Sequence, residues 1–293
     1  ETISKQAQNP ILTISDPLEG DNIVNAQEST DFVISGTGVD GLTVNFSASN
    51  ANGNSLSGSA IVADGIWTSN SFDISSFVEG ALTISATETD ANQNTATATH
   101  IVNLDFSAST PVISTPIAED GIVNADEVTA TEISGTAEPN SVVSISLSDG
   151  TTTIGPFDVD TDDAGEWSTT TNIVSLSDGN IIVSASETDE AGNTGTVVTE
   201  SFEKDTTAPS IFISTPISGD NIVNAAEEEN VLIEGTSDPD TTIELLVTRG
   251  TVELSYSVPV DSNGDWAIVT NLASLPDGEL TITALAEDPA GNT

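Results

Sequence analysis

Apolar residues alternate with polar residues in short runs along the whole chain. Residues 142–147 read Val-Val-Ser-Ile-Ser-Leu, and residues 280–285 read Leu-Thr-Ile-Thr-Ala-Leu. A period of two is typical of a strand with one buried face. No segment combines helix caps with an apolar period of 3.6 residues. We therefore predict an all-β chain. Within residues 206–293 the expected strands are 210–216, 231–236, 242–247, 252–260, 266–271 and 279–286.

The same pattern occurs three times, at intervals of 99 or 100 residues. The motif Asp-x-Ile-Val-Asn-Ala-x-Glu begins at Asp21, Asp120 and Asp220. Three other landmarks keep the same phase: the Gly-Thr pairs at Gly36, Gly135 and Gly235; the tryptophans Trp67, Trp167 and Trp266; and acidic turns ending in Asn-Thr at 90–95, 189–194 and 288–293. An interval near 100 residues is the size of a small independent domain. We predict three tandem domains, at residues 1–105, 106–205 and 206–293.

Seven short runs with turns between them indicate an antiparallel β-sandwich of the immunoglobulin type in each unit. We expect the tryptophan of each unit to pack between the two sheets. The second unit continues after Asn193 into a seventh run at 196–202, which the third unit lacks, while residues 1–5 align with residues 200–204. Two explanations remain open. The segment was cut out of a longer array, or the N-terminal strand of one molecule completes the third unit of another.

Charge excludes several classes of function. The chain has 47 acidic and three basic residues, a net charge of -44, and no cysteine. Such a chain has no basic face for nucleic acid or an anionic lipid surface, and no cysteine for disulfides, zinc or thiol chemistry. It contains no apolar run long enough to span a membrane and no visible signal peptide. No catalytic motif is present, so we expect a monomer that is not an enzyme and has no catalytic residues.

Carboxylates spread over every unit repel one another unless a cation binds where they converge. Calcium prefers six to eight oxygen ligands, which Asp, Glu, Asn and backbone carbonyls supply, whereas magnesium demands stricter geometry. In a seven-stranded sandwich alternate loops lie at opposite ends, so a junction would gather the linker, loops of the following unit and loops of the preceding one. The candidate calcium ligands are Asp105 and Asp205 in the linkers; Asp90, Asp189, Asp288, Glu187 and Glu287 near the sixth-to-seventh-strand turns; Glu138 and Asp238 in the second-to-third-strand turns; and Asp21, Asp120, Asp220 and Asn124 in the Asp-x-Ile-Val-Asn-Ala-x-Glu motifs.

Each acidic turn also has an interpretation without metal. Asp and Asn in tight turns commonly accept hydrogen bonds from their own backbone. The Asp-x-Ile-Val-Asn-Ala-x-Glu motif is either such a turn scaffold, with Glu28 capping it, or a source of ligands, and the sequence leaves both open. The run 158–162 resembles the start of an EF-hand loop but has Asp163 at position six and Thr169 at position twelve, where Gly and Glu are required.

Several of these motifs resemble those of a known family. The turn Asp-x-Ala-Gly-Asn-Thr, the Gly-Asp-Trp and Gly-Glu-Trp triplets and the linker Asp205-Thr-Thr-Ala-Pro209 are similar to those of bacterial immunoglobulin-like repeats in giant RTX-type adhesins, which Gram-negative bacteria export by type I secretion. The resemblance implies calcium at the domain junctions, with Asp105, Asp205, Asp90, Asp189 and Asp288 as ligands. It also implies an extracellular location at the bacterial surface. The first linker, 105–109, lacks the Thr-Thr-Ala-Pro sequence, and Gln6 stands where a linker Asp is expected.

We therefore predict an extracellular spacer, stiffened by Ca2+, that projects a distant adhesive domain for attachment or biofilm formation. Its partners are neighbouring repeats of the same polypeptide, and the host or surface ligand is bound elsewhere in the parent protein. Two alternatives are an immunoglobulin-like module that binds a glycan or a protein, and an accessory β-sandwich region of a secreted hydrolase.

Overall fold

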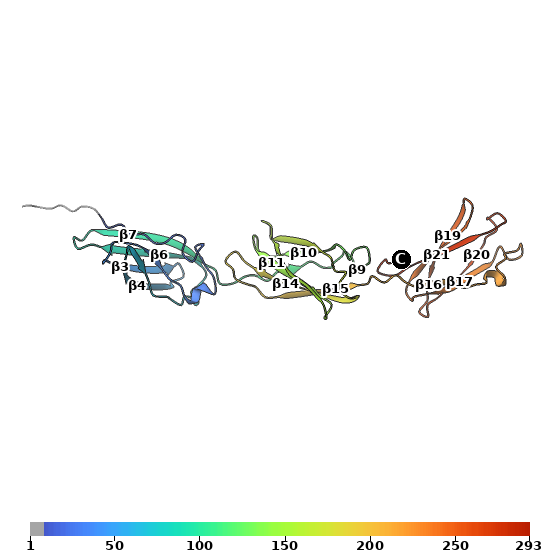
Figure 1. Cartoon of the computed structure of the whole chain (residues 1–293), viewed down its shortest axis with the longest axis horizontal. Coiled ribbons are helices and arrows are strands. Elements are labelled where there is room, and N and C mark those ends of the chain that lie inside the picture. The colour runs from blue at the N-terminus through green and yellow to red at the C-terminus, as the bar shows by residue number, and fades with distance from the viewer. Residues whose placement is uncertain (1–8) are drawn as a thin grey trace, which may run out of the picture.

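The computed structural model describes residues 9–293 as three β-sandwiches arranged in a row (Figure 1). Buried hydrophobic residues form one cluster in each sandwich, from Leu12 to Leu104, from Ile113 to Phe202 and from Val231 to Ala286. The helical segments among the described residues are two short 3-10 turns, η1 (Glu28–Thr30) and η2 (Ile217–Gly219). No described helix is long and apolar enough to cross a membrane. These observations confirm the predicted all-β fold of three tandem sandwiches. The strand-like segment predicted at residues 1–5 lies outside the described residues.

The first and second units each contain a five-stranded sheet. In the first unit its order is β1 (Ile23–Val24), β7 (Thr95–Leu104), β6 (Gly80–Thr89), β3 (Thr43–Asn50) and β4 (Ser55–Ile61), and β2 (Ser35–Thr37) pairs with β5 (Ile66–Thr68) opposite. In the second unit the order is β12 (Thr153–Asp160), β11 (Val142–Ser148), β14 (Gly179–Thr188), β15 (Val198–Lys204) and β9 (Ile122–Val123). The opposite sheet of that unit is β13 (Glu166–Thr171), β10 (Thr131–Thr136) and β8 (Val112–Ile113).

The third unit has two three-stranded sheets. One is β19 (Val252–Pro259), β18 (Thr242–Arg249) and β21 (Thr281–Glu287), and the other is β16 (Ile211–Ile213), β17 (Val231–Ser237) and β20 (Asp265–Thr270). These six strands coincide with the six expected from the sequence, although β16 ends at Ile213 rather than at residue 216. The strand that β7 and β15 provide beside β6 and β14 has no counterpart beside β21 among the described residues.

Alternation along the strands places one face in the core. In β3, Val44, Phe46 and Ala48 are buried while Asn45 and Ser47 are exposed. Antiparallel strands turn successive side chains to opposite faces, so this period of two fixes which face packs inward. The alternation of apolar and polar residues in the sequence therefore identifies the side chains that form the sandwich core.

The tryptophan of each unit packs against a glycine on the neighbouring strand. Trp167 is 3% exposed and lies opposite Gly135 in the β10–β13 ladder. A Cβ atom on Gly135 would lie 1.9 Å from the Val112 carbonyl oxygen of β8 and 2.4 Å from Cζ2 of Trp167. Gly36 and Gly235 stand opposite Trp67 and Trp266 in the same way. The predicted burial of tryptophan between the sheets thus depends on the Gly-Thr landmark.

Replacement of this glycine tests the packing. Gly135→Ala should destabilise the second unit by about 2–3 kcal/mol, because both the β8 backbone and the indole must move to admit a methyl group. Urea unfolding followed by tryptophan fluorescence measures the effect, since each unit carries one tryptophan. Thr136→Ala, at the exposed neighbouring position, is the control. Equal midpoints for the two variants would contradict the packing role of Gly135.

Candidate functional site

The linkers are direct continuations of the last strand of each sandwich. β7 runs parallel to β1, and the backbone N–H of Asp105, just beyond β7, donates to the Val24 carbonyl oxygen at 3.0 Å. The second linker repeats this contact, with Asp205 N–H donating to Val123 O at 3.0 Å. Each linker aspartate is therefore fixed to the unit that precedes it through its main chain.

The turn between the last two strands of each unit is organised by an aspartate and an asparagine. Asp189 accepts two hydrogen bonds from Asn193: Oδ1 from the backbone N–H at 2.8 Å and Oδ2 from Nδ2 at 2.9 Å. Asp288 binds Asn292 at 2.9 and 3.0 Å in the same manner. The corresponding bonds between Asp90 and Asn94 are both 2.9 Å. The predicted ligands Asp90, Asp189 and Asp288 thus hold an asparagine in a fixed orientation.

This asparagine joins consecutive units. Asn193 Nδ2 donates to the carbonyl oxygen of linker Asp105 at 3.0 Å, and its Oδ1 accepts the backbone N–H of Ala26, in the first unit, at 2.9 Å. At the second junction Asn292 donates to Asp205 O and accepts from Ala125 N–H, both at 3.0 Å. A side-chain amide can donate and accept at once, so one residue holds both the linker and the preceding unit.

At each junction a second asparagine, which belongs to the preceding unit, donates a hydrogen bond to the following unit. Asn25 Nδ2 donates to Ala191 O and Asn124 Nδ2 donates to Ala290 O, each at 3.0 Å. Asn25 Oδ1 also accepts the backbone N–H of Glu28 at 2.9 Å, while Glu28 Oε2 accepts the Asn25 N–H at 3.0 Å. This reciprocal pair is a capping box. The Asp-x-Ile-Val-Asn-Ala-x-Glu motif is therefore a turn scaffold in the structure, and its asparagine amide contacts the next unit.

Each turn that receives this amide needs a glycine. Gly192 and Gly291 have φ angles of 89° and 87°, which favour glycine, and a Cβ on either residue would lie 3.6 Å from the incoming asparagine Nδ2. The sequence Asp-x-Ala-Gly-Asn-Thr thus combines a tight turn with close approach of the preceding unit. Sequence reasoning selected the Asp of this motif and passed over Asn193 and Asn292. Their recurrence at the same position in each copy was the available signal.

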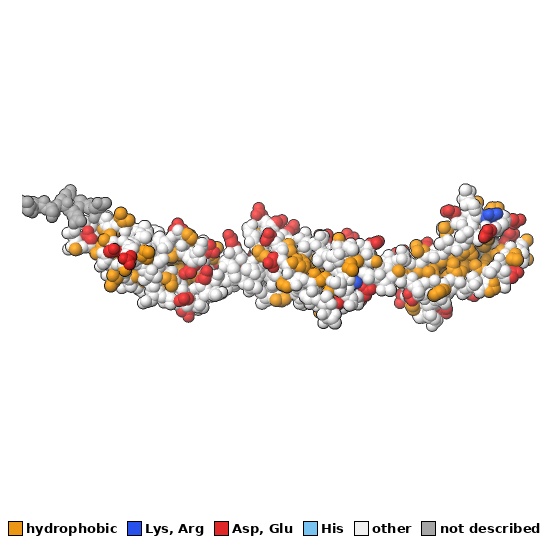
Figure 2. All heavy atoms as spheres, viewed as in Figure 1, with side chains coloured by type: hydrophobic (Ala, Val, Ile, Leu, Met, Phe, Trp, Pro, Cys, Tyr) orange, Lys and Arg blue, Asp and Glu red, His pale blue; other side chains and the backbone are white. Residues whose placement is uncertain are grey.

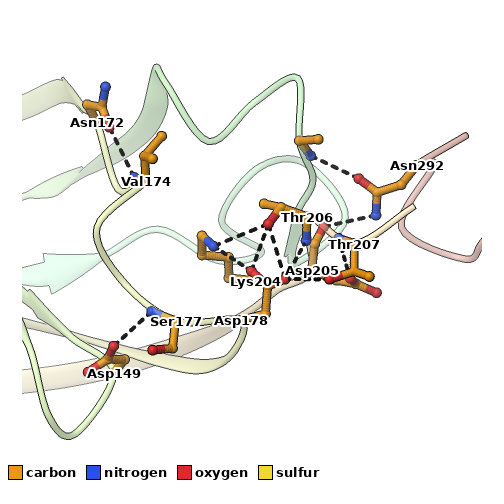
Figure 3. A network of polar contacts seen from close by, with 11 residues as sticks. Asp149, Asn172, Val174, Ser177, Asp178, Lys204, Asp205, Thr206, Thr207 and Asn292 are labelled. Atoms are coloured by element: carbon orange, nitrogen blue, oxygen red, sulfur yellow. Dashed lines mark hydrogen bonds and ion pairs between the residues drawn. The ribbon is translucent and has the colours of Figure 1, made fainter. Parts of the chain in front are cut away.

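An acid at the opposite end of the first and of the second unit also holds the linker, and Figure 3 shows the one in the second unit, Asp178. Asp178 forms an ion pair with buried Lys204 and accepts hydrogen bonds from Thr206 N–H at 3.1 Å and Thr207 Oγ1 at 3.0 Å. Desolvation raises the pKa of Asp178, but the bonds from Lys204 and the threonines outweigh it and lower the pKa to about 2. In the first unit Glu79 accepts Phe106 N–H and Ser107 Oγ, both at 2.9 Å, although Leu104 replaces the lysine.

The first junction also places acidic side chains within electrostatic range of one another. Glu187 is fully buried, and its two oxygens accept Glu138 N–H at 2.8 Å and Ser109 Oγ at 2.6 Å. Desolvation raises the pKa of Glu138, and repulsion from Glu187, Asp189 and Asp105 raises it further. The pKa of Asp105 is likewise raised, by desolvation and by repulsion from Asp189 and Glu79. The linker and three loop acids of the following unit are therefore close enough to affect one another, as the sequence predicts.

The second junction has fewer acids. Ala286 stands where the second unit has Glu187, while Glu287 aligns with Thr188 and is exposed. Glu287, one of the candidate ligands, is therefore not the counterpart of Glu187, because a shift of one strand position turns a side chain to the other face. Asp238, the counterpart of Glu138, accepts Ser210 N–H at 2.9 Å and Ser210 Oγ at 3.1 Å.

The remaining predicted ligands lie in local turns. The Oδ1 atoms of Asp21, Asp120 and Asp220 each accept the backbone N–H two residues further on, at 2.8, 2.8 and 2.9 Å. Across residues 9–293, no three Asp, Glu or His side chains stand as a ready-made metal cluster. At the first junction the available donors are all oxygens of Asp105, Glu138, Glu187 and Asp189, which suit a hard cation such as calcium. The calcium ligand set therefore stays a prediction.

Comparisons with known proteins show which domain families and solved structures this chain is similar to. Residues 107–206 match a family described as bacterial Ig-like domain, and residues 165–293 match bacterial Ig-like domain, group 3. A solved structure of a 1.5-MDa bacterial ice-binding adhesin, studied for its retention at the host cell surface, is 23% identical, with 99% of this chain and 95% of that chain covered and a TM-score of 0.50. That likeness shows a shared fold.

Two further solved structures are similar in sequence but superpose less well as whole chains. A tetra-tandem repeat from the extending region of a large adhesion protein is 27% identical, covers 96% of this chain and 71% of that chain, and has a TM-score of 0.35. A Ca2+-stabilized adhesin, which helps an Antarctic bacterium reach out and bind ice, is 24% identical, with coverages of 96% and 74% and a TM-score of 0.45. No curated protein matches the chain.

Loss of the bridging asparagine should loosen one junction. Asn193→Ala removes two bonds between units, each worth about 1 kcal/mol. Small-angle X-ray scattering should then show a wider range of interdomain angles, while each sandwich stays folded. Asn94→Ala is the matched control, because its turn has the same internal bonds and no preceding unit among the described residues. Identical scattering from the two variants would show that the bridge does not fix the junction.

The raised pKa values at the first junction predict a pH dependence. Between the ordinary values of 3.8 and 4.5 and the raised pKa values of Asp105 and Glu138, the folded state binds more protons than the unfolded state. The free energy of unfolding therefore falls as pH rises through this window, and lowering the pH from neutral toward the ordinary glutamate value of 4.5 should stabilise the second unit. Below the ordinary value of 3.8, protonation of Asp178, with its pKa of about 2, acts in the opposite direction.

Thermal unfolding at neutral pH and near the ordinary glutamate pKa of 4.5 tests this assignment. Glu138→Gln should raise the unfolding temperature at neutral pH and reduce the gain on acidification, because the neutral amide does not repel the other three carboxylates. Asp163→Asn removes the same charge from an exposed turn of the same unit and is the control. An equal effect of both substitutions would mean that net charge, not the junction, sets the pH dependence.

Proposed function

The chain belongs to the bacterial immunoglobulin-like domains, and on that premise we propose that it is an extracellular spacer of a bacterial surface adhesin, stiffened by calcium at its domain junctions. Its role is structural rather than enzymatic. It holds a distal adhesive domain away from the cell, and its own partners are the repeats before and after it. The resemblance of its linker and turn motifs to those of RTX-type adhesins supports this context.

One observation carries the proposal: both junctions use the same set of interdomain hydrogen bonds. Asn25 and Asn193 at the first junction correspond to Asn124 and Asn292 at the second, and equivalent bonds agree within 0.1 Å. A module that grips a ligand needs one specialised unit. Repetition of the junction instead serves a chain whose units must follow one another with a defined orientation, which is the requirement of a spacer.

Without a bound cation, the hydrogen bonds at the junctions would have to hold the units together against electrostatic repulsion. Red acidic side chains are visible on all three units in Figure 2, and the net charge is -44. Repulsion between neighbouring units opposes their close approach at the junctions. At the first junction Asp105, Glu138, Glu187 and Asp189 would hold calcium, and at the second Asp205, Asp238 and Asp288 would do so. The bound ion would supply positive charge where these carboxylates meet.

The residues of the chain prepare this site without the ion. Asp189 and Asn193 fix the turn, buried Glu187 orients the loop that carries Glu138, and the backbone bond from Asp105 to Val24 places the linker. Calcium sites of extracellular modules commonly have dissociation constants of about 10⁻⁴ to 10⁻³ M. A site filled at 100 times its dissociation constant adds about 2.7 kcal/mol of stability.

Calcium titration tests the proposal directly. Added Ca2+ should raise the thermal unfolding temperature and narrow the distribution of interdomain angles seen by X-ray scattering, and a chelator should reverse both effects. Asp105→Asn should weaken the response at the first junction, because it removes a carboxylate and leaves the backbone contacts of residue 105 in place. Asp163→Asn controls for lost charge, and Mg2+ controls for ionic strength. Melting and scattering that do not change with Ca2+ or chelator would refute calcium stiffening.

A further inference from the structure

One strand in each unit borders its sheet and pairs with a single neighbour among the described residues. These edge strands are β4, which pairs with β3, β12, which pairs with β11, and β19, which pairs with β18. An edge strand presents unpaired N–H and C=O groups, which pair with another chain unless proline, charge or a bulge blocks them. The three edge strands differ in whether they carry such a block.

The edge strands of the second and third units are blocked. β12 contains Pro156, Asp158 and Asp160, and a shift in register interrupts its ladder with β11. β19 contains Glu253 and ends at Pro259. Proline offers no N–H, and a carboxylate on the edge repels a second acidic chain. Both edges are therefore protected against pairing.

β4, in the first unit, has none of these features. Its sequence, Ser-Leu-Ser-Gly-Ser-Ala-Ile, contains no proline and no charge, and its ladder with β3 is unbroken from Ser55 to Ile61. The residues that block β12 are thus replaced by small or apolar residues in β4. The two ladders align Ser57 with Pro156, Ser59 with Asp158 and Ile61 with Asp160.

This edge also lies in the longest stretch of the chain without charge. No acidic or basic residue and no histidine occurs from Gly41 to Ala63, a range that includes all of β3 and β4. In a chain with a net charge of -44, a second copy meets electrostatic repulsion over most of the surface. Repulsion is weakest beside these two strands, whose exposed side chains are Thr43, Asn45, Ser47, Ser49, Ser55, Ser57, Ser59 and Ile61.

The backbone of alternate residues in β4 is available for pairing. Val62 N–H donates to Leu42 O at 2.9 Å, and in an antiparallel ladder every second pair is hydrogen-bonded in this way. Leu56, Gly58 and Ala60 therefore bond to β3. The N–H and C=O groups that point away from the sheet belong to Ser55, Ser57, Ser59 and Ile61.

We propose that β4 pairs with β4 of a second copy of this chain, antiparallel about a two-fold axis at Gly58. In this register Ser57 lies opposite Ser59 of the second copy, and Ser55 lies opposite Ile61. All the free groups of both strands are then used, in about eight main-chain hydrogen bonds. The two Gly58 residues meet at a non-hydrogen-bonded position, where Cα atoms approach to about 4.5 Å. The interface is isologous, so it closes at a dimer.

The same register covers apolar side chains at the edge. Leu56 and Ala60 are partly buried and pack against the core of the first unit. Leu56 of one copy lies opposite Ala60 of the other, and this cross-strand contact removes apolar surface from water. Phe46 fills the space beside Gly58, because a Cβ there would lie 2.6 Å from its Cζ. The centre of the interface is therefore flat.

Charge at the two ends of β4 favours an antiparallel pair. Asp64 follows the C-terminal end of the strand, and Asp40 lies there too, since its carboxylate accepts the N–H of Gly65. The turn at 50–54, at the other end, is uncharged. Antiparallel pairing places each acidic end beside the uncharged turn of the other copy, whereas parallel pairing would bring the four carboxylates together.

The antiparallel arrangement also separates the remaining units. The strands of the first unit run along the long axis of the array (Figure 1). The second and third units of the two copies would therefore extend in opposite directions, which keeps their acidic surfaces apart. For the spacer proposed above, this geometry joins rods that project from two facing surfaces. That consequence rests on the proposed function, whereas the pairing itself does not.

Sedimentation equilibrium of the full chain in chelator and about 0.15 M salt tests the pairing independently of calcium. The weight-average mass should rise with concentration and level off at twice the monomer mass. Ser57→Pro should weaken association at least about tenfold, because it removes an edge N–H from both strands. Ser57→Ala keeps that N–H and is the matched control. A chain that stays monomeric up to millimolar concentration, or equal association of the two variants, would overturn the proposal.

Charge gives a second variant that does not alter the backbone. Ser59→Asp places at the β4 edge the carboxylate that β12 has there, and it should also weaken association. Ser47→Asp adds the same charge to the same face on β3, away from the edge, and should have a smaller effect. Circular dichroism checks that each variant is folded. Equal effects of the two aspartates would contradict pairing through the edge.

A spin label measures the register directly. The chain has no cysteine, so Thr99→Cys carries the label at one exposed position on β7. In the joined sheet, seven strand spacings of about 4.8 Å separate β7 of one copy from β7 of the other, so pulsed electron paramagnetic resonance should give one distance of about 30–35 Å. Absence of this distance, or its persistence after Ser57→Pro, would exclude the proposed pair.

Discussion

The peptide groups of the two linker aspartates are hydrogen-bonded to both the preceding and the following sandwich. The orientation of consecutive units depends on these bonds. The N–H of Asp105 or Asp205 completes the ladder of the preceding sandwich, while the C=O accepts the side-chain amide of the following one. Because both contacts use main-chain atoms, they tolerate different linker sequences. The linkers 105–109 and 205–209 share only one residue after the aspartate, Ala108 and Ala208, yet make the same bonds. Interdomain orientation is therefore encoded in asparagines and turn geometry rather than in the linker side chains.

The two junctions share their hydrogen bonds but differ in their charge. Glu187 is buried at the first junction and acts on Glu138, whereas Ala286 occupies its position at the second. A buried carboxylate that accepts two hydrogen bonds is stable where it lies, but its charge raises the cost of ionising its neighbours. The bridging bonds thus join the units in the same way at both junctions, and the acids set how strongly each junction responds to protons. Junctions with the same geometry can differ in this response through a single residue such as Glu187.

Sequence reasoning succeeded where the information was periodic. Alternation predicted the six strands of the third unit, and the 99- to 100-residue interval predicted three sandwiches. The position of loops at alternate ends brought Asp105, Glu138, Glu187 and Asp189 to one junction. It failed where the information was chemical and local: charge drew attention to Asp189 and Asp288, while the neutral Asn193 and Asn292 make the interdomain contacts. Glu287 is not the counterpart of Glu187, because a shift of one residue along a strand reverses the face of the side chain, and spacing alone does not reveal such a shift.

Continuity between the last strand and the linker couples the completion of one sandwich to the placement of the next. In the second unit the ladder that pairs Lys204 with Val123 passes directly into the bond from Asp205 N–H to Val123 O. The last strand of the second unit, β15, thereby delivers Asp205 to the position from which its carbonyl oxygen accepts the side-chain amide of Asn292.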